Sequence, residues 1–246
     1  MKGVILAGGL ATRLRPLTLV TNKHLLPIYN KPMIYFPLEA MVAAGIKDIL
    51  ITSSPDHGGD FEDLLGSGES FGANILYGVQ QNPKGGISDA IALAEEFASG
   101  DKLLVILGDN IFRTDLKNTA SEFEKKEKGA LIYGIKMATD SRHYGVIERD
   151  STGKVLSIEE KPENPKSDIA QTGIYMYDNR VFDFIKKLSP SGRGELEVTD
   201  LNNMYVQEGT LQCELLDWWI DAGASYDELL RANNLVAEKV KKGELS

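Results

Sequence analysis

Apolar residues in the first half of the chain form short continuous runs that alternate with stretches of helical spacing. Residues 4–6 and 103–107 are uninterrupted apolar runs, which is typical of strands in a parallel sheet that is covered on both faces. The pattern predicts strands at 2–7, 46–52, 75–80 and 103–107 and helices at 33–44, 60–65 and 87–98. Repeated βα units of this kind predict an α/β fold with a mostly parallel, doubly wound (Rossmann-like) sheet and helices on both faces.

The second half of the chain is less regular. It predicts hairpin-like strands, which decorate a sheet edge or cover a subsite, and the final helix begins at Ser225, where Ser-Tyr-Asp-Glu has the form of a capping box. We predict one domain over 1–246, with a first half (about 1–112), an inserted smaller β-rich part (about 113–224) and a C-terminal helix (about 225–246). The expected elements are strands at 130–137, 144–149, 154–159 and 172–178 and helices at 180–188 and 199–207.

Composition and charge exclude several classes of function. The 246-residue chain has a net charge of −9, so a nucleic-acid partner bound through phosphate neutralisation is not expected. Cys213 is the only cysteine, which excludes an internal disulfide and suits a reducing cytoplasm. No apolar run approaches the ~20 residues that span a membrane, and the glycines and arginines within 3–15 do not fit a secretory signal. We therefore expect a soluble, cytoplasmic protein with no membrane partner.

A glycine-rich turn follows the first predicted strand. Gly8 and Gly9 let backbone amides approach a phosphate chain, and Arg13 and Lys23 add positive charge for the same anion. The sequence therefore predicts a loop that holds a nucleoside triphosphate. A dinucleotide-dependent oxidoreductase would instead need Gly-x-Gly-x-x-Gly at this place, and the third glycine is missing.

Two aspartates and a lysine follow predicted strands or apolar runs. Asp109, in Leu-Gly-Asp-Asn, lies at the carboxyl end of a central strand, where α/β sheets place their ligands and where a carboxylate suits Mg²⁺. Asp221 follows a second apolar run, and two such aspartates on one Mg²⁺ would suit phosphoryl or nucleotidyl transfer. Taken singly, each aspartate could also be a turn or cap residue, and Lys161 could be part of a solvated charge cluster.

In combination, these motifs resemble those of the sugar nucleotidyltransferases, and within that family the branch that joins dTTP to glucose 1-phosphate. The resemblance runs from residue 2 to about 235 with the motifs in family order. The motifs are Gly-Gly-x-x-Thr-Arg-Leu-x-Pro, Lys-x-Leu-Leu-Pro-x-x-x-Lys-Pro-Met-Ile, Gly-Asp-Asn, Tyr-Gly-Val, Glu-Glu-Lys-Pro and Arg-Gly-Glu-Leu-Glu-Val-Thr-Asp.

The resemblance implies roles for individual residues. Arg13, Lys23 and Lys161 would be the catalytic cations, acting on the departing pyrophosphate, on phosphate near the reacting centre and on the sugar phosphate respectively. Asp109 and Asp221 would hold Mg²⁺ as the cofactor. The nucleotide would contact Leu6, Gly8, Gly9, Thr12, Arg13, Gln80, Gly85, Gly86 and Asp109, and the sugar Asn110, Gly145, Glu160, Lys161, Gln171 and Thr172.

The implied reaction is attack of the sugar phosphate on the α-phosphorus of dTTP, with pyrophosphate leaving, in an enzyme expected to be a homo-oligomer. UTP or another sugar phosphate on the same scaffold remains an alternative, because one methyl group on the base is worth only ~1–3 kcal/mol. A non-catalytic nucleotide-sugar sensor would keep the pocket but lose the metal and clamp residues, which are all present.

The chain departs from the family pattern at a few places. Ala11 replaces the usual loop glycine, and we expect the loop to tolerate it unless that position needs a positive φ. The sequence also leaves open whether Gly85 or Gly86 meets the base. His24 replaces a frequent glutamine, and the segment 214–219 is shorter than its counterpart, which puts the presentation of Asp221 in doubt.

Overall fold

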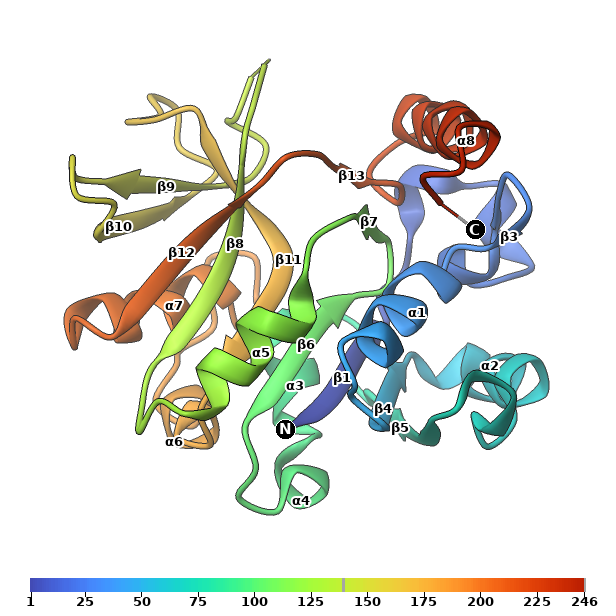
Figure 1. The fold of residues 1–246 in the computed structure, drawn as a ribbon, viewed down its shortest axis with the longest axis horizontal. Helices are drawn as coiled ribbons and strands as arrows, with labels where there is room; N and C mark the ends of the chain where they lie inside the picture. The colour runs from blue at the N-terminus through green and yellow to red at the C-terminus, as the bar shows by residue number, and fades with distance from the viewer. Residues whose placement is uncertain (139, 246) are drawn as a thin grey trace.

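The computed structural model describes residues 1–138 and 140–245 and is built on a nine-stranded sheet (Figure 1). Its main strand order is β10-β9-β11-β6-β1-β4-β5, with β8 paired to β11 and β12 paired to β8. The strands β5, β4, β1 and β6 run parallel to one another. The sheet strands are β1 (Lys2–Ala7), β4 (Asp48–Ser53), β5 (Asn74–Val79), β6 (Leu103–Leu107), β8 (Ala130–Lys136), β9 (Gly145–Arg149), β10 (Val155–Glu160), β11 (Ile169–Tyr177) and β12 (Leu211–Leu216).

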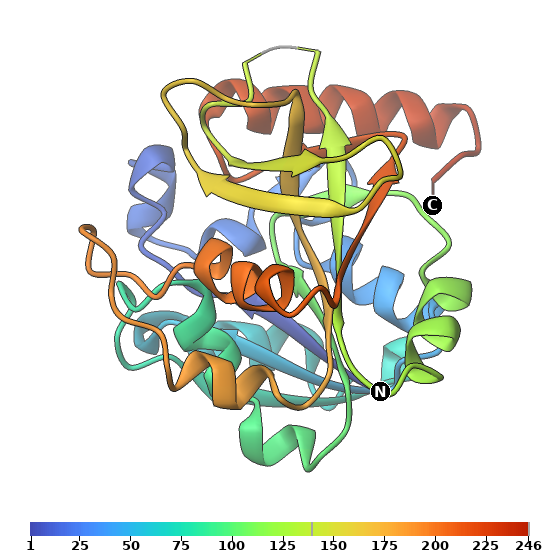
Figure 2. The same ribbon diagram turned by 90° about the vertical axis from the view of Figure 1, so that its left-hand side faces the viewer.

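The continuous apolar runs are buried because neighbouring residues pack into cores on opposite faces of the sheet. In β1, Ile5 belongs to one core cluster while Val4 and Leu6 belong to the other. One face is covered by α1 (Tyr35–Ala43), α2 (Gly58–Leu65) and α5 (Leu116–Glu124), and the opposite face by α3 (Ile87–Ala92), α4 (Glu95–Ala98), α6 (Val181–Ile185) and α7 (Val198–Gln207), as Figures 1 and 2 show from two sides. The predicted α/β fold, with a sheet covered on both faces, is confirmed.

The prediction of a single helix at 87–98 was wrong in one respect: the structure divides this segment into α3 and α4. At the junction the Ala94 amide donates to the Ile91 carbonyl, three residues back, and Ala94 has φ −84° and ψ 1°. This tighter turn interrupts the α-helical hydrogen bonding. The 3-10 turns are η1 (Thr12–Leu14), η2 (Leu17–Leu19), η3 (Lys23–Leu25), η4 (Pro55–His57) and η5 (Glu69–Phe71).

The strands of the second half extend the sheet as well as decorating it. β11 pairs antiparallel with both β6 and β8, so the chain continues the central sheet beyond β6. The β9–β10 hairpin lies to one side of this extension (Figure 1). The sequence analysis missed β12 and α5, which have few uninterrupted apolar residues, and β11 begins at Ile169, earlier than expected.

A third core forms where the C-terminal helix crosses the carboxyl end of the sheet. The helix α8 (Tyr226–Lys241) buries Ala232 and Val236 against Ile111 and Ile220. As predicted, Ser225 caps it by accepting a hydrogen bond from the Glu228 amide. The short strands here, none of them predicted, are β2 (Pro27–Ile28), β3 (Lys31–Pro32), β7 (Asn110–Phe112) and β13 (Trp219–Asp221).

Candidate active site

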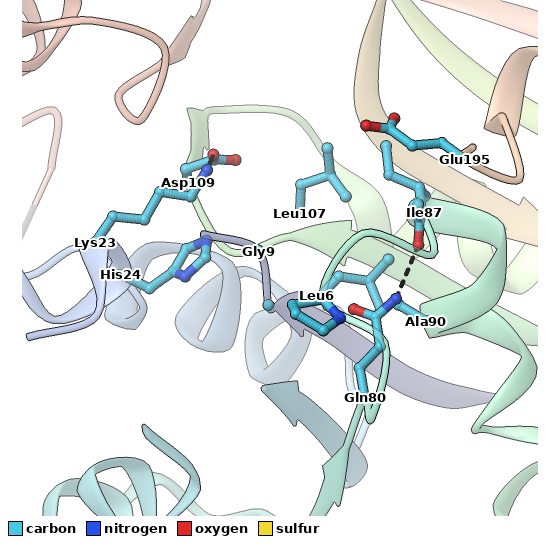
Figure 3. Close-up of a pocket in the computed structure, with 13 residues that line it drawn as sticks. Leu6, Gly9, Lys23, His24, Gln80, Ile87, Ala90, Leu107, Asp109 and Glu195 are labelled. Carbon is cyan, nitrogen blue, oxygen red and sulfur yellow. Dashed lines mark hydrogen bonds and ion pairs between the residues drawn. The ribbon is translucent and has the colours of Figure 1, made fainter. Parts of the chain in front are cut away.

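A cavity of about 250 Å³ opens at the carboxyl ends of the parallel strands, where ligands bind in open α/β sheets (Figure 3). The predicted residues in its wall are Leu6, Gly8, Gly9, Lys23, Gln80, Gly86 and Asp109. Leu6 lies near the end of β1, and Gly8, Gln80 and Asp109 come just after β1, β5 and β6, so the parallel sheet brings them to one edge. The remaining lining residues, which the sequence analysis did not single out for this site, are His24, Pro83, Ile87, Ala90, Leu107 and Glu195.

The predicted phosphate loop adopts a left-handed backbone at Ala11, the position where a glycine was expected. Ala11 has φ 45° and ψ 38°, and Gly9 has φ 93°. The Thr18 hydroxyl donates to the Ala11 carbonyl at 2.8 Å, and buried Leu14 anchors the following turn. Alanine was expected to be tolerated only if this position had a negative φ. The structure instead holds Ala11 in a left-handed conformation, which L-residues disfavour.

Asp109 is held between a lysine and an amide. Lys23 Nζ donates to Asp109 Oδ2 at 2.5 Å, and Asn110 Nδ2 donates to Asp109 Oδ1 at 3.0 Å. The Asn110 oxygen accepts from the Gly173 amide (2.8 Å) and from Trp219 Nε1 (2.6 Å), so this buried side chain fixes Asp109. Burial alone would raise the pKa of Asp109, but the Lys23 charge, the His24 ring and the hydrogen bonds from Lys23 and Asn110 together outweigh it and lower that pKa to about 2.

Asp221 reaches the same place through strand pairing. β13 runs antiparallel to β7, which sets Asp221 opposite Asn110, and the Ala222 amide donates to the Asp109 carbonyl at 2.9 Å. The next residue must be small, because a Cβ at Gly223 would lie 2.6 Å from Asp109 Oδ2. Burial and the negative charge of Asp109 raise the pKa of Asp221 to about 7.

The pair of carboxylates fits a hard divalent cation. Asp109 is buried, Asp221 and Lys23 are partly buried beside it, and the two carboxylates outnumber the one lysine; this excess of negative charge raises the pKa of Asp221. Within the part of the chain that the structure describes, no group of three or more His, Cys, Asp or Glu side chains could hold a metal. Mg²⁺ accepts such a site, because it binds through one or two carboxylates together with substrate phosphates and water.

His24 packs beneath the cluster as a neutral imidazole. Its Nδ1 lies 2.7 Å from Asn22 Oδ1, and burial together with the Lys23 charge lowers its pKa to about 3. A Cβ at Gly108 would lie 2.7 Å from His24 Cδ2. His24 therefore supports the backbone that presents Asp109, and it requires glycine at 108.

The Gln80 side chain lines the cavity, and its two amide ends have different roles. Its Nε2 donates to the Gly86 carbonyl (3.1 Å) and to Asp89 Oδ2 (2.8 Å), as Figure 3 shows for the first of these bonds. The amide hydrogens are thus used internally, and Oε1 remains as an acceptor toward Gly8. Gly86, with φ 88°, lines the cavity, whereas Gly85 packs on Asp89.

Apart from Asn110 in β7, the predicted sugar residues lie at or near the ends of β9, β10 and β11. Thr199 Oγ1 donates to Glu160 Oε2 at 2.7 Å, and Arg193 Nη2 lies 3.3 Å from Glu160 Oε1. Lys161, also in a left-handed backbone conformation (φ 45°), has its Nζ 3.4 Å from Glu160 Oε1. The predicted Thr172 instead commits its hydroxyl to the Tyr133 carbonyl at 2.8 Å. Arg193 and Thr199 belong to the Arg-Gly-Glu-Leu-Glu-Val-Thr-Asp motif, which could have identified them.

The remaining predicted residues differ in how closely the structure ties them to this centre. Thr12 and Arg13 are exposed on η1, outside the cavity wall. The charge of Arg13 nevertheless lowers the pKa values of both Lys23 and Asp221, as one of the smaller contributions. The structure therefore joins Lys23 and Asp109 by a hydrogen bond, and brings Asp221 and Arg13 close enough for their charges to act on this pair.

This fold and site define a nucleotidyl transferase, and the chain belongs to that family, whose model matches residues 2–239. Its relatives include the glucose-1-phosphate thymidylyltransferase of Neisseria gonorrhoeae, which is 46% identical over 227 residues (91% of this chain and 78% of the relative). That of Mycobacterium tuberculosis strain H37Rv is 41% identical over 239 residues (96% and 82%). The predicted resemblance is confirmed.

Solved structures agree. A Bacillus anthracis protein assigned as a glucose-1-phosphate thymidylyltransferase, in complex with sucrose, is 46% identical with a TM-score of 0.90 (96% of this chain and 94% of that chain). A UDP-glucose pyrophosphorylase complexed with UDP-glucose has a TM-score of 0.86 at 23% identity (97% and 98%) and shares the fold. No helix in the described ranges 1–138 and 140–245 is long and apolar enough to cross a membrane.

Proposed function

We propose that this enzyme condenses dTTP with α-D-glucose 1-phosphate to give dTDP-glucose and pyrophosphate, using Mg²⁺. The observation that carries the proposal is the Lys23–Asp109–Asp221 cluster, in which Lys23 and Asp109 line the cavity and Asp221 lies close enough for their charges to shift its pKa. The thymidylyltransferase relatives support the choice of dTTP and glucose 1-phosphate.

The reaction needs no protein nucleophile or general base. An oxygen of the sugar phosphate attacks the α-phosphorus in line, a new P–O bond forms, and the bond to the pyrophosphate oxygen breaks. A phosphate monoester with a second pKa of about 6 is already largely dianionic at neutral pH. The barrier is the approach of two anions, so catalysis rests on positioning and on charge compensation.

The chain's own cations supply that compensation from different sides. Arg13 on η1 would meet the departing pyrophosphate, Lys23 the phosphate at the reacting centre, and Lys161 the sugar phosphate. Mg²⁺ held by Asp109 and Asp221 would neutralise charge on the phosphate oxygens. Lys23 is fixed for this task by its hydrogen bond to Asp109, so little reorganisation is needed when the nucleotide binds.

The base and the sugar would be recognised by complementary hydrogen bonds. The free acceptor of Gln80 matches the N3–H donor shared by thymine and uracil, so UTP is the nearest competing nucleotide. On the other side Glu160, an acceptor when ionised, would receive a sugar hydroxyl proton. Gly145 pairs with Glu160 in the β9–β10 ladder, and Gln171 lies next to Gly145.

A pyrophosphate-release screen tests the proposal. We expect Mg²⁺-dependent release with dTTP and glucose 1-phosphate, at a higher kcat/KM than with UTP or with other hexose 1-phosphates. Binding of dTDP-glucose without pyrophosphate release from any pair would overturn the proposal in favour of a nucleotide-sugar sensor. The homo-oligomer, the single domain and the cytoplasmic location remain predictions; sedimentation, limited proteolysis and cell fractionation respectively test them.

A further inference from the structure

A chain of buried amide and hydroxyl groups runs from the aromatic core to the sugar side of the site. The Tyr177 hydroxyl donates to Asn202 Oδ1 at 2.7 Å, and Asn202 Nδ2 donates to Gln171 Oε1 at 2.9 Å. Tyr177 and Asn202 are fully buried and Gln171 is 7% exposed. Gln171 and Tyr177 lie on β11 and Asn202 on α7, so this series of hydrogen bonds forms only when the protein folds.

The donors and acceptors in this hydrogen-bond series have a fixed order, because the buried Tyr177 hydroxyl has a single proton to donate. Burial raises the pKa of Tyr177 well above its ordinary value, so the hydroxyl stays protonated. When that proton goes to Asn202 Oδ1, Asn202 must present its NH₂ group to its other neighbour. Gln171 then meets Asn202 with its oxygen, and its own NH₂ group faces the opposite way.

The Gln171 side chain, which also hydrogen-bonds the Tyr175 hydroxyl, has its Nε2 beside Gly145, where the predicted sugar residues meet. A Cβ at Gly145 would lie 3.5 Å from Gln171 Nε2 and 3.1 Å from Thr199 Oγ1. Thr199 is in turn bonded to Glu160 Oε2, so an amide donor and a carboxylate acceptor lie on the same side of Gly145. Lys161 and Arg193 flank the other carboxylate oxygen, and a carboxylate offers only acceptors.

We propose that Tyr177 and Asn202 are positioning residues that hold the Gln171 amide with its nitrogen toward the sugar, so that Gln171 and Glu160 together read one sugar hydroxyl as both acceptor and donor. The inference rests on the proposed function, since it assumes a sugar 1-phosphate in this site. Hydroxyl recognition then depends on residues that never touch the substrate.

The test compares kcat/KM of the wild type and the variants for glucose 1-phosphate and for each of its monodeoxy analogues. One analogue should lose more kcat/KM than the others in the wild-type enzyme, which identifies the hydroxyl that is read. Tyr177→Phe removes the donor that orders the chain, so the preference for glucose 1-phosphate over that analogue should fall by about three- to tenfold. The KM for dTTP should not change.

Tyr205→Phe is the matched control. Tyr205 packs on Tyr177 with ring centroids 5.8 Å apart, but its hydroxyl donates to Asp178 and takes no part in the chain. We expect its hydroxyl preference to equal that of the wild type. Equal losses in both variants, or a Tyr177→Phe loss spread over all analogues, would mean that Tyr177 acts only through packing and would overturn the proposal.

Gln171→Met separates positioning from stability. In this background the amide is gone, so Tyr177→Phe should cause no further loss of hydroxyl preference. Additive losses would overturn the proposal. Wild-type enzyme that turns over no sugar 1-phosphate would overturn the proposed function itself, whereas turnover with unchanged preference in Tyr177→Phe overturns this inference alone.

Discussion

Asp221 lies directly opposite Asn110 in the two-stranded ladder of β7 and β13. Asn110 also donates from its side-chain amide to Asp109. Asn110 therefore contacts both candidate metal ligands: the backbone of Asp221 and the side chain of Asp109. The separation of the two carboxylates is therefore set by a backbone ladder, which is more rigid than side-chain packing alone. The following predictions depend on this arrangement.

Asp109→Asn should lower kcat by about 10²–10³-fold or more, because the site loses charge that would hold Mg²⁺ and fix Lys23. Circular dichroism should show a native spectrum, since the neutral amide has the same shape. Asp217→Asn is the matched control, because Asp217 is an exposed carboxylate in the same segment as Asp221. Undiminished Mg²⁺-dependent turnover in Asp109→Asn would remove the metal assignment.

The stability of the metal-free protein should depend on Asp221 between about pH 4 and pH 7. Burial and Asp109 raise its pKa from 3.8 to about 7, so in this window the folded protein holds a proton that the unfolded chain has lost. The contribution of Asp221 to the free energy of unfolding therefore falls as pH rises through the window and is level above it. Asp109, with a lowered pKa, contributes stability that is lost only at lower pH.

Thermal unfolding in EDTA measures this effect. Asp221→Asn cannot titrate, so the wild type should lose Tm relative to Asp221→Asn as the pH is raised from about 4 to about 7. Parallel Tm profiles for the two proteins would contradict the prediction.

Ala11→Gly should stabilise the phosphate loop. At φ 45° alanine has a left-handed conformation that costs about 1–2 kcal/mol, although glycine returns part of this through the entropy of the unfolded chain. We expect a net gain of up to about 1 kcal/mol, or a rise of about 2–4 °C in Tm. Ala92→Gly, within α3, should have the opposite sign, and a Tm loss in both variants would show that glycine at 11 is not favoured.

Gly108→Ala should destabilise the protein by about 1–3 kcal/mol and reduce turnover, because the new methyl group would overlap the buried His24 ring. The double-mutant cycle with His24→Ala tests the cause. In that background the added methyl group has room, so Gly108→Ala should cost little further stability in urea unfolding. An undiminished cost would assign the strain to another contact.

The nucleotide site should reject dCTP. Cytosine presents an acceptor at N3, which would meet the Gln80 oxygen without a proton between them, and such a mismatch costs about 1–3 kcal/mol. We expect dTTP and UTP to bind about tenfold to a hundredfold more tightly than dCTP in calorimetric titrations. Gln80→Leu should narrow this gap, and a gap of unchanged size would locate base selection elsewhere.

Much of the nucleotide side could be predicted from the sequence. Residues 4–6 and 103–107 are apolar at every position because both faces of the strands are covered, and that pattern is local. The carboxyl ends of parallel strands share one edge, so Gly8, Gly9 and Asp109 had to lie close together. The positive φ of Ala11 could not be predicted, because it is set by the closure of the whole loop, which the identity of one residue does not reveal.

The sequence by itself therefore determined the strands, the faces they bury and the positions of the phosphate loop and Asp109, because periodicity and strand polarity are properties of neighbouring residues. Only the tertiary structure decided that Asp221 pairs with Asn110, that Gln80 offers an oxygen, and that Gln171 turns its nitrogen outward. Each of these depends on hydrogen-bond partners far away in the chain, whose direction is set only when the buried groups meet.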